Sequence, residues 1–103
     1  MVIRSAFHPQ IIELNSNNLN IIDINVGRAK HTVLKVFSII QSKPIIDITH
    51  TSELIGKTFR TTSKAISILV ELGILKKVEQ KERYQVFAYE DYLNILREGT
   101  EVI

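Results

Sequence analysis

Residues 57–75, KTFRTTSKAISILVELGIL, predict a helix with one buried and one exposed side. Thr58 suits the N-cap, because its hydroxyl can accept a hydrogen bond from a free backbone N–H of the first turn. Gly73 suits the other end, because glycine readily adopts the left-handed conformation that closes a helix. Residues 59–72, from Phe59 to Leu72, then give a helix of about four turns. The residues expected to face a core recur at spacings of three and four: Thr62, Ala65, Ile66, Leu69 and Leu72.

The opposite side of this helix carries hydroxyl groups and cations. Such groups reach phosphates and base edges when a helix lies in the major groove of DNA. An ordinary solvated helix face is the alternative interpretation, and the rest of the chain has to decide between the two. The outward residues are Lys57, Arg60, Thr61, Ser63, Lys64 and Ser67.

The composition is that of one small globular protein. The chain has 103 residues, 45% hydrophobic and 23% charged, which is too few for two independent domains of comfortable size. It has no cysteine, which excludes disulfides and thiolate metal sites. No apolar run approaches the roughly 20 residues of a membrane span, and the N-terminus does not resemble a secretion signal. We therefore expect a soluble, cytoplasmic protein with no membrane partner.

Positive charge is concentrated in the middle of the chain, although the net charge is only +2. Residues 57–83 hold seven cations and three anions, whereas residues 84–103 hold one cation and four anions. This asymmetry favours binding to a polyanion through one face, and a solvated surface of mixed sign is the alternative.

Residues 8–25 predict a helix with an interruption. Pro9 suits the first helical position, and apolar residues follow it at helical spacing. The run Asn15-Ser16-Asn17-Asn18 competes for the backbone and favours turns, so one frayed helix or two short ones are expected, ending near Gly27. We predict an N-terminal helical extension over residues 1–26 that packs on the main body or on a second copy, followed by a domain over residues 27–103. A remnant of a preceding domain is the alternative for the extension.

The next segments predict a helix-turn-helix. Residues 28–42 are apolar around most of a helix surface, and Pro44 follows. Residues 45–48 suit a short strand, and Asp47 can cap a helix over residues 49–55 that Gly56 closes. Because only two residues separate Gly56 from the next helix, the two helices form a helix-turn-helix. The first helix is expected to face inward through Thr51, Leu54 and Ile55.

After Gly73 the apolar pattern changes from a helical to an alternating period. An apolar segment around Val78 leads into a polar loop over residues 79–83, and residues 84–89 alternate as a strand does. Residues 90–98 then predict a last helix that Gly99 stops. The predicted fold is mainly α with a small three-stranded antiparallel sheet: a winged helix-turn-helix with an extra N-terminal helix and a C-terminal helix.

From Gly27 to its end the chain resembles the C-terminal winged-helix domain of Fic family proteins, the AMP-transferring enzymes. The segments that carry the resemblance are LGILK at residues 72–76, the wing strand RYQVFAY at residues 83–89 and YLNILREGTE at residues 92–101. The resemblance implies a module appended to a catalytic domain. The Fic catalytic motif itself is absent, because His8 stands in Phe7-His8-Pro9 with no glycine-rich phosphate loop after it. We therefore assign this chain no catalytic residue, no enzyme activity and no cofactor.

Other candidate chemistry gives no site. His8, His31 and His50 are about twenty residues apart, so solvated or capping roles are favoured over a metal site. Phe59 can contact a thymine methyl, but packing beneath the turn is the favoured interpretation. The spacing of the C-terminal aromatics indicates core or rim positions rather than base stacking: Tyr84, Phe87, Tyr89 and Tyr92.

Two hypotheses for function follow. In the first, the helix from Phe59 to Leu72 enters the major groove of double-stranded DNA, as in transcription regulation, while Lys81 and Arg83 on the wing touch phosphates. A homodimer is then expected, because a single copy binds weakly. In the second, the chain is an interaction module that docks on its own Fic catalytic domain, on a target protein or on itself. The small net charge and the apolar N-terminal stripe favour the second.

Overall fold

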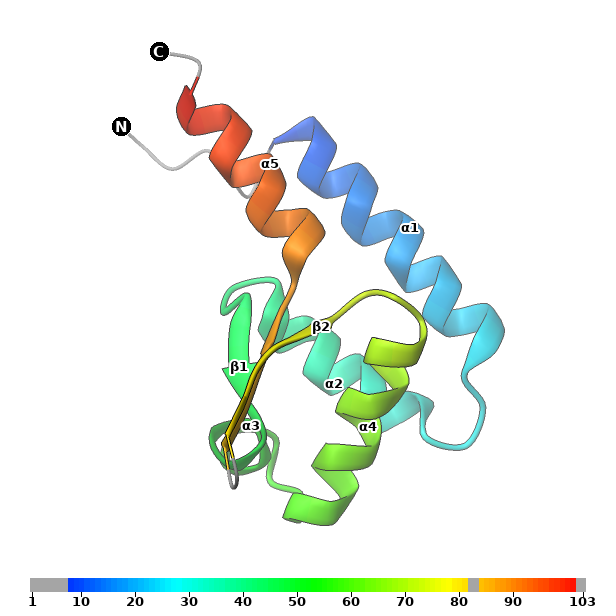
Figure 1. The fold of residues 1–103 in the computed structure, drawn as a ribbon. Helices are drawn as coiled ribbons and strands as arrows, with labels where there is room; N and C mark the ends of the chain where they lie inside the picture. Colours follow the sequence, from blue (N-terminus) through cyan, green and yellow to red (C-terminus); the bar gives the residue numbers. More distant parts are fainter. Residues whose placement is uncertain (1–7, 82–83, 102–103) are drawn as a thin grey trace.

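The computed structural model describes residues 8–81 and 84–101, and these residues form a winged helix. The elements follow the predicted order of helices and strands (Figure 1). This arrangement confirms the predicted fold class. The bounds are α1 (Pro9–Asn25), α2 (Lys30–Ile40), β1 (Ile45–Asp47), α3 (Ile48–Ile55), α4 (Phe59–Glu71), β2 (Lys76–Lys81), β3 (Tyr84–Ala88) and α5 (Glu90–Glu101).

The three strands form an antiparallel sheet in the order β1-β3-β2. Phe87 lies at its centre, opposite Ile46 on one side and Lys77 on the other, and the β2–β3 ladder has an irregularity at Val78. Strand β2 continues to Lys81, so the prediction of a loop over residues 79–83 is wrong for residues 79–81. Backbone pairing across a hairpin does not require apolar side chains, and the polar composition of this segment therefore misled the prediction.

Helix α1 is one continuous helix, so the predicted alternative of two short helices is wrong. Two of the asparagines in its centre have tertiary partners. The Nδ2 of Asn18 donates to the hydroxyl of Tyr89 at 2.9 Å, and that hydroxyl donates to the Oδ1 of Asn15 at 2.7 Å. Because these side-chain groups are satisfied by Tyr89, they do not compete for the helix backbone.

A single core joins the helices α1 to α5 and the sheet, and α1 and α5 lie side by side (Figure 1). Helix α1 contributes Ile11 and Ile22 to this core, and Val26 follows directly after the helix. Three of the four C-terminal aromatics are buried, as predicted, while the side chain of Tyr84 lies outside the described residues. Other fully buried members are Val33, Val36, Ile40, Ile66, Leu69 and Leu75.

Two local predictions are wrong. Leu54 is 58% exposed, because Ile48, Thr51 and Ile55 define the buried side of α3 and Leu54 lies about 100° around the helix from Ile55. Gly99 does not stop the last helix, since α5 continues to Glu101. A glycine inside a helix costs only about 1 kcal/mol relative to alanine, so it ends a helix only where it takes the left-handed conformation.

Candidate nucleic-acid interface

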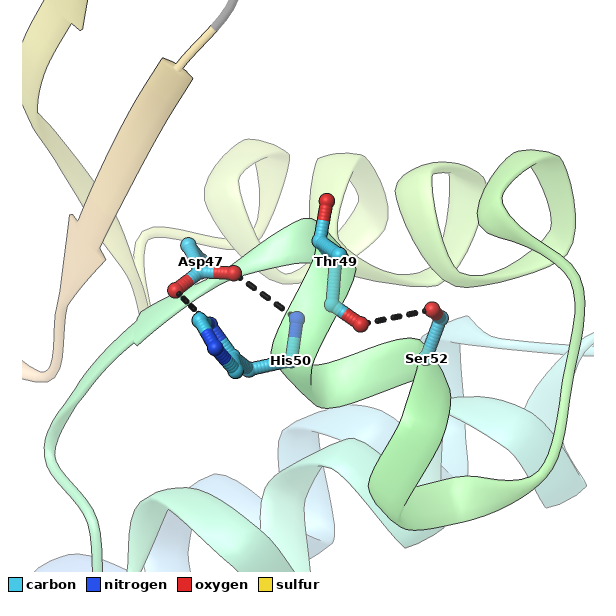
Figure 2. A network of polar contacts seen from close by, with 4 residues as sticks. All are labelled: Asp47, Thr49, His50 and Ser52. Atoms are coloured by element: carbon cyan, nitrogen blue, oxygen red, sulfur yellow. Dashed lines mark hydrogen bonds and ion pairs between the residues drawn. The ribbon is translucent and has the colours of Figure 1, made fainter.

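Helix α3, the first helix of the helix-turn-helix, begins at a side-chain cap and ends at a glycine. The carboxylate of Asp47 caps it: Oδ1 accepts from the backbone N of His50 at 2.8 Å, and Oδ2 contacts the ring Nδ1 of His50 at 2.7 Å (Figure 2). In the same turn, the Ser52 hydroxyl donates to the carbonyl of Thr49 at 2.8 Å (Figure 2). Gly56 then closes the helix with a φ of 69°, which only glycine adopts without strain. These bonds determine where the chain turns toward α4.

The Asp47–His50 contact predicts a pH dependence. The hydrogen bond to Asp47 and the negative charge of that carboxylate raise the pKa of His50 above its usual 6.5. A raised folded-state pKa means that protonation stabilises the fold below pH 6.5 and that this contribution is lost as the pH rises through the folded-state pKa. We therefore expect His50→Ala to lower the melting temperature most below pH 6.5 and less as the pH rises through the folded-state pKa of His50.

An NMR titration of the His50 ring measures this shift directly. The control is Asp47→Asn, because asparagine is as good an N-cap as aspartate but lacks the charge. In that variant the pKa of His50 should return toward 6.5. An unchanged pKa would contradict the assignment to Asp47.

Helix α4 has the predicted caps. The Thr58 hydroxyl oxygen accepts from the backbone N of Thr61 at 3.1 Å, and its proton is directed to the Thr61 Oγ1 at 3.0 Å. At the other end, Gly73 has a φ of 82°, and the backbone N of Ile74 donates to the carbonyl of Leu69 at 2.9 Å. The caps bracket α4 as the sequence predicts, and the chain turns away directly after Leu72.

The two sides of α4 are divided as predicted. The inward side is buried through Thr62, Ala65, Ile66 and Leu69, while Leu72 is half-buried. Along the outward side, a stripe at spacings of four, three and four residues runs from the N-terminal to the C-terminal end: Arg60, Lys64, Ser67 and Glu71, all exposed. Lys57 and Thr61 are also exposed, and Ser63 is half-buried.

A groove separates the outward side of α4 from the sheet. Its polar lining comes from α4 and from the hairpin: Ser63, Ser67, Glu71, Lys77 and Gln85. Its apolar lining comes from Ile48, Val70 and Phe87. Lys77 was not among the predicted site residues, although its position in the cationic segment at the start of the wing was a signal that pointed to it.

The predicted wing contacts lie at the end of the hairpin. Lys81 is the last residue of β2 and pairs with Tyr84, but its side chain lies outside the described residues, as does the whole of Arg83. Their contact with phosphates stays a prediction. Among the described side chains of the hairpin, those of Lys77 and Gln85 lie beside α4.

The exposure of Phe59 contradicts the prediction that its side chain packs beneath the turn. As the first residue of α4 it is 56% exposed, so it does not pack beneath the turn. Phe59 lies within about 60° of Thr62 and in line with Ile66 around the helix, so its exposure comes from its place in the first turn, before the buried side begins at Thr62.

The histidines occupy the predicted kinds of position. The Nδ1 of His8 accepts from the backbone N of Gln10 at 3.1 Å as the N-cap of α1, and His31 is exposed. Within residues 8–81 and 84–101, no cluster of three potential metal ligands occurs. In the same part of the chain, no helix combines the length and apolar character needed to cross a bilayer.

Comparisons with known proteins add little to this geometry. No protein-family model matches the chain, and no curated protein matches it. Among solved structures, the chain is similar to a MarR protein from Peptoclostridium difficile, with a TM-score of 0.49 and 22% sequence identity, over 97% of this chain and 73% of that one. None of these comparisons shows the resemblance to Fic family proteins. The winged-helix assignment therefore rests on the order of the elements and on the sheet topology.

Proposed function

We propose that this chain is a DNA-binding module in which α4 enters the major groove of double-stranded DNA. The observation that carries the proposal is the exposed stripe of α4, which begins with Arg60 and Lys64 and continues to Ser67, where it borders the groove beside the hairpin. A major groove about 12 Å wide admits an α-helix, and a helix of 13 residues is about 20 Å long. The size of α4 and its exposed cations and hydroxyl groups are therefore suited to the major groove.

The residues divide into two roles in this proposal. Arg60 and Lys64 carry the charge that reaches bases and nearby phosphates, with hydroxyl contacts from Thr61, Ser63 and Ser67. Lys57 before the helix binds phosphate, and Lys81 and Arg83 add phosphate contacts along the wing. Lys77 shares the groove with Glu71, so these two opposite charges offset each other there. Glu71 ends the stripe with a negative charge, which disfavours phosphate there and directs the N-terminal half of α4 toward the DNA.

Salt dependence tests this proposal. Fluorescence anisotropy with a labelled random-sequence duplex should show binding that weakens steeply between 50 and about 200 mM salt. The double variant Arg60→Ala/Lys64→Ala should weaken binding about tenfold or more, and it should make the slope of log K against log salt shallower by about 1.8 if both residues neutralise phosphates.

The matched control is Lys43→Ala, which removes an exposed lysine that lies between α2 and β1. Its affinity and salt slope should equal those of the unmodified chain. Absence of binding at low salt, or equal losses in the control and the double variant, would rule out the proposed role of α4.

A second candidate function is docking on protein, as the resemblance to the Fic C-terminal domain implies. The observation that favours it is the number of large apolar side chains that α1 exposes, namely Ile12, Leu19 and Ile24. In this alternative the module over residues 27–103, with α1 as its extension, contacts a Fic catalytic domain, a target protein or a second copy. Sedimentation equilibrium tests self-association, and a strict monomer at high concentration would exclude the homodimer.

A further inference from the structure

We propose that Phe59 recognises thymine, by placing its ring against the 5-methyl group of that base in the major groove. The inference rests on the proposed function and adds a residue that determines sequence preference. It was the less favoured interpretation of the sequence, and the exposure of the side chain reverses that order.

The position of Phe59 is the first argument. It is the first residue of α4, directly after the capping residue Thr58. In a helix-turn-helix, the N-terminal residues of the recognition helix contact base edges. A side chain at this position is therefore directed at bases when α4 docks.

The surroundings of Phe59 are the second argument. Its ring is flanked along the chain by the exposed cations Lys57 and Arg60. Cations on both sides would hold phosphates and bring the ring close to the DNA. On the helix it shares an edge with Ser63, four residues on, and Ser63 lines the groove beside the hairpin. Phe59 thus continues the candidate interface instead of forming a separate apolar patch.

The chemistry of the ring selects the base. A phenylalanine side chain has no hydrogen-bonding group, so it cannot read the donors and acceptors of the major groove. The apolar group that the major groove presents is the 5-methyl of thymine. Burying one methyl group is worth about fourfold in affinity, and that is the preference expected for each contacted thymine.

Replacing thymine by uracil tests the contact, because deoxyuridine differs from thymidine only by the missing methyl group. Duplexes that bind the unmodified chain are first selected from a random pool and then synthesised with dT or with dU at each position. The chain should bind the duplex with dU at the contacted position about fourfold more weakly.

Two variants assign the effect to the ring. Phe59→Ala should bind the dT and dU duplexes equally, with its salt slope unchanged. The control Ile12→Ala truncates a side chain of similar exposure, 52%, on α1, and it should keep the fourfold difference. Circular dichroism of Phe59→Ala should match that of the unmodified chain, since an exposed side chain contributes little to the fold.

The outcomes separate this inference from the proposed function. Equal binding of dT and dU duplexes by the unmodified chain overturns the role of Phe59, while DNA binding itself stands. A difference that persists in Phe59→Ala also overturns it, because another residue then reads the methyl. Failure to select any duplex overturns the proposed function as a whole.

Discussion

Tyr89→Ala is expected to lower the free energy of unfolding by about 3–5 kcal/mol, which is the usual cost of truncating a buried aromatic residue. The Tyr89 side chain is fully buried. Its ring meets Phe37 edge-on with centroids 6.1 Å apart and stacks on Tyr92 at 5.6 Å. A loss of this size is a large part of the stability of a small domain, so unfolding in urea should shift to a much lower midpoint.

The variant Tyr89→Phe isolates the hydroxyl from the ring. It keeps the aromatic packing but removes the partner of Asn18, which is itself buried, and of Asn15. A buried polar group left without a partner costs about 1–3 kcal/mol, so Tyr89→Phe should be clearly destabilised but less so than Tyr89→Ala. Equal stability of Tyr89→Phe and the unmodified chain would contradict the role assigned to the hydroxyl.

An alkaline titration adds a readout for the same group. Burial raises the pKa of Tyr89 to about 12, and the hydrogen bond from Asn18 opposes this shift. The unfolded chain loses this proton near pH 10 and the folded chain does not, so the stability contributed by the protonated hydroxyl is lost as the pH rises above 10. Tyr89→Phe should lack this part of the alkaline loss.

Ile22→Ala is the second large effect, with an expected loss of about 2–5 kcal/mol. Ile22 belongs to α1 and is completely buried in the core shared with α2 and the sheet. If α1 is part of one cooperative unit, this substitution lowers the stability of the whole chain, and not only that of α1. Urea unfolding followed both by far-UV circular dichroism and by tyrosine fluorescence tests this, because one cooperative unit gives coincident transitions with the two probes.

The matched control is Ile24→Ala, the same substitution two residues away on the same helix. Ile24 is 76% exposed, so its replacement should change stability by no more than about 0.5 kcal/mol. Similar effects of the two substitutions would show that α1 does not pack as described. A loss of α1 alone, with the remaining transition unchanged, would support the predicted division between residues 1–26 and residues 27–103.

The sequence was most informative where the physical signal is local. Asp47 and Thr58 cap helices within three residues of themselves, and Gly56 and Gly73 take the left-handed conformation that only glycine adopts freely. Each of these signals depends on the residue and its immediate neighbours, so no tertiary information was needed. They bracket α3 and α4 and thus define the helix-turn-helix, including the exposed positions of Arg60 and Lys64.

The sequence was least informative where a residue far along the chain determines the local structure. Asn18 and Tyr89 are 71 residues apart, and nothing near either residue indicates that they meet. Without that pairing, the Asn-rich centre of α1 looked like a break. The prediction that Phe59 packs beneath the turn was wrong for a different reason. A large apolar side chain is assigned to the core by default, and only the structure shows that this one is exposed.

The hydrogen bonds of Tyr89 with Asn15 and Asn18 connect α1 to the strand that forms the wing. Tyr89 directly follows β3, the strand that pairs with β2, and its hydroxyl is held by the middle of α1. Both asparagines lie in the middle of the 17-residue helix, so the sheet is bonded to the centre of α1 and not to its ends. The outer side of α1 and the groove beside α4 therefore belong to one bonded unit, which joins the first helix of the chain to the strand that completes the wing.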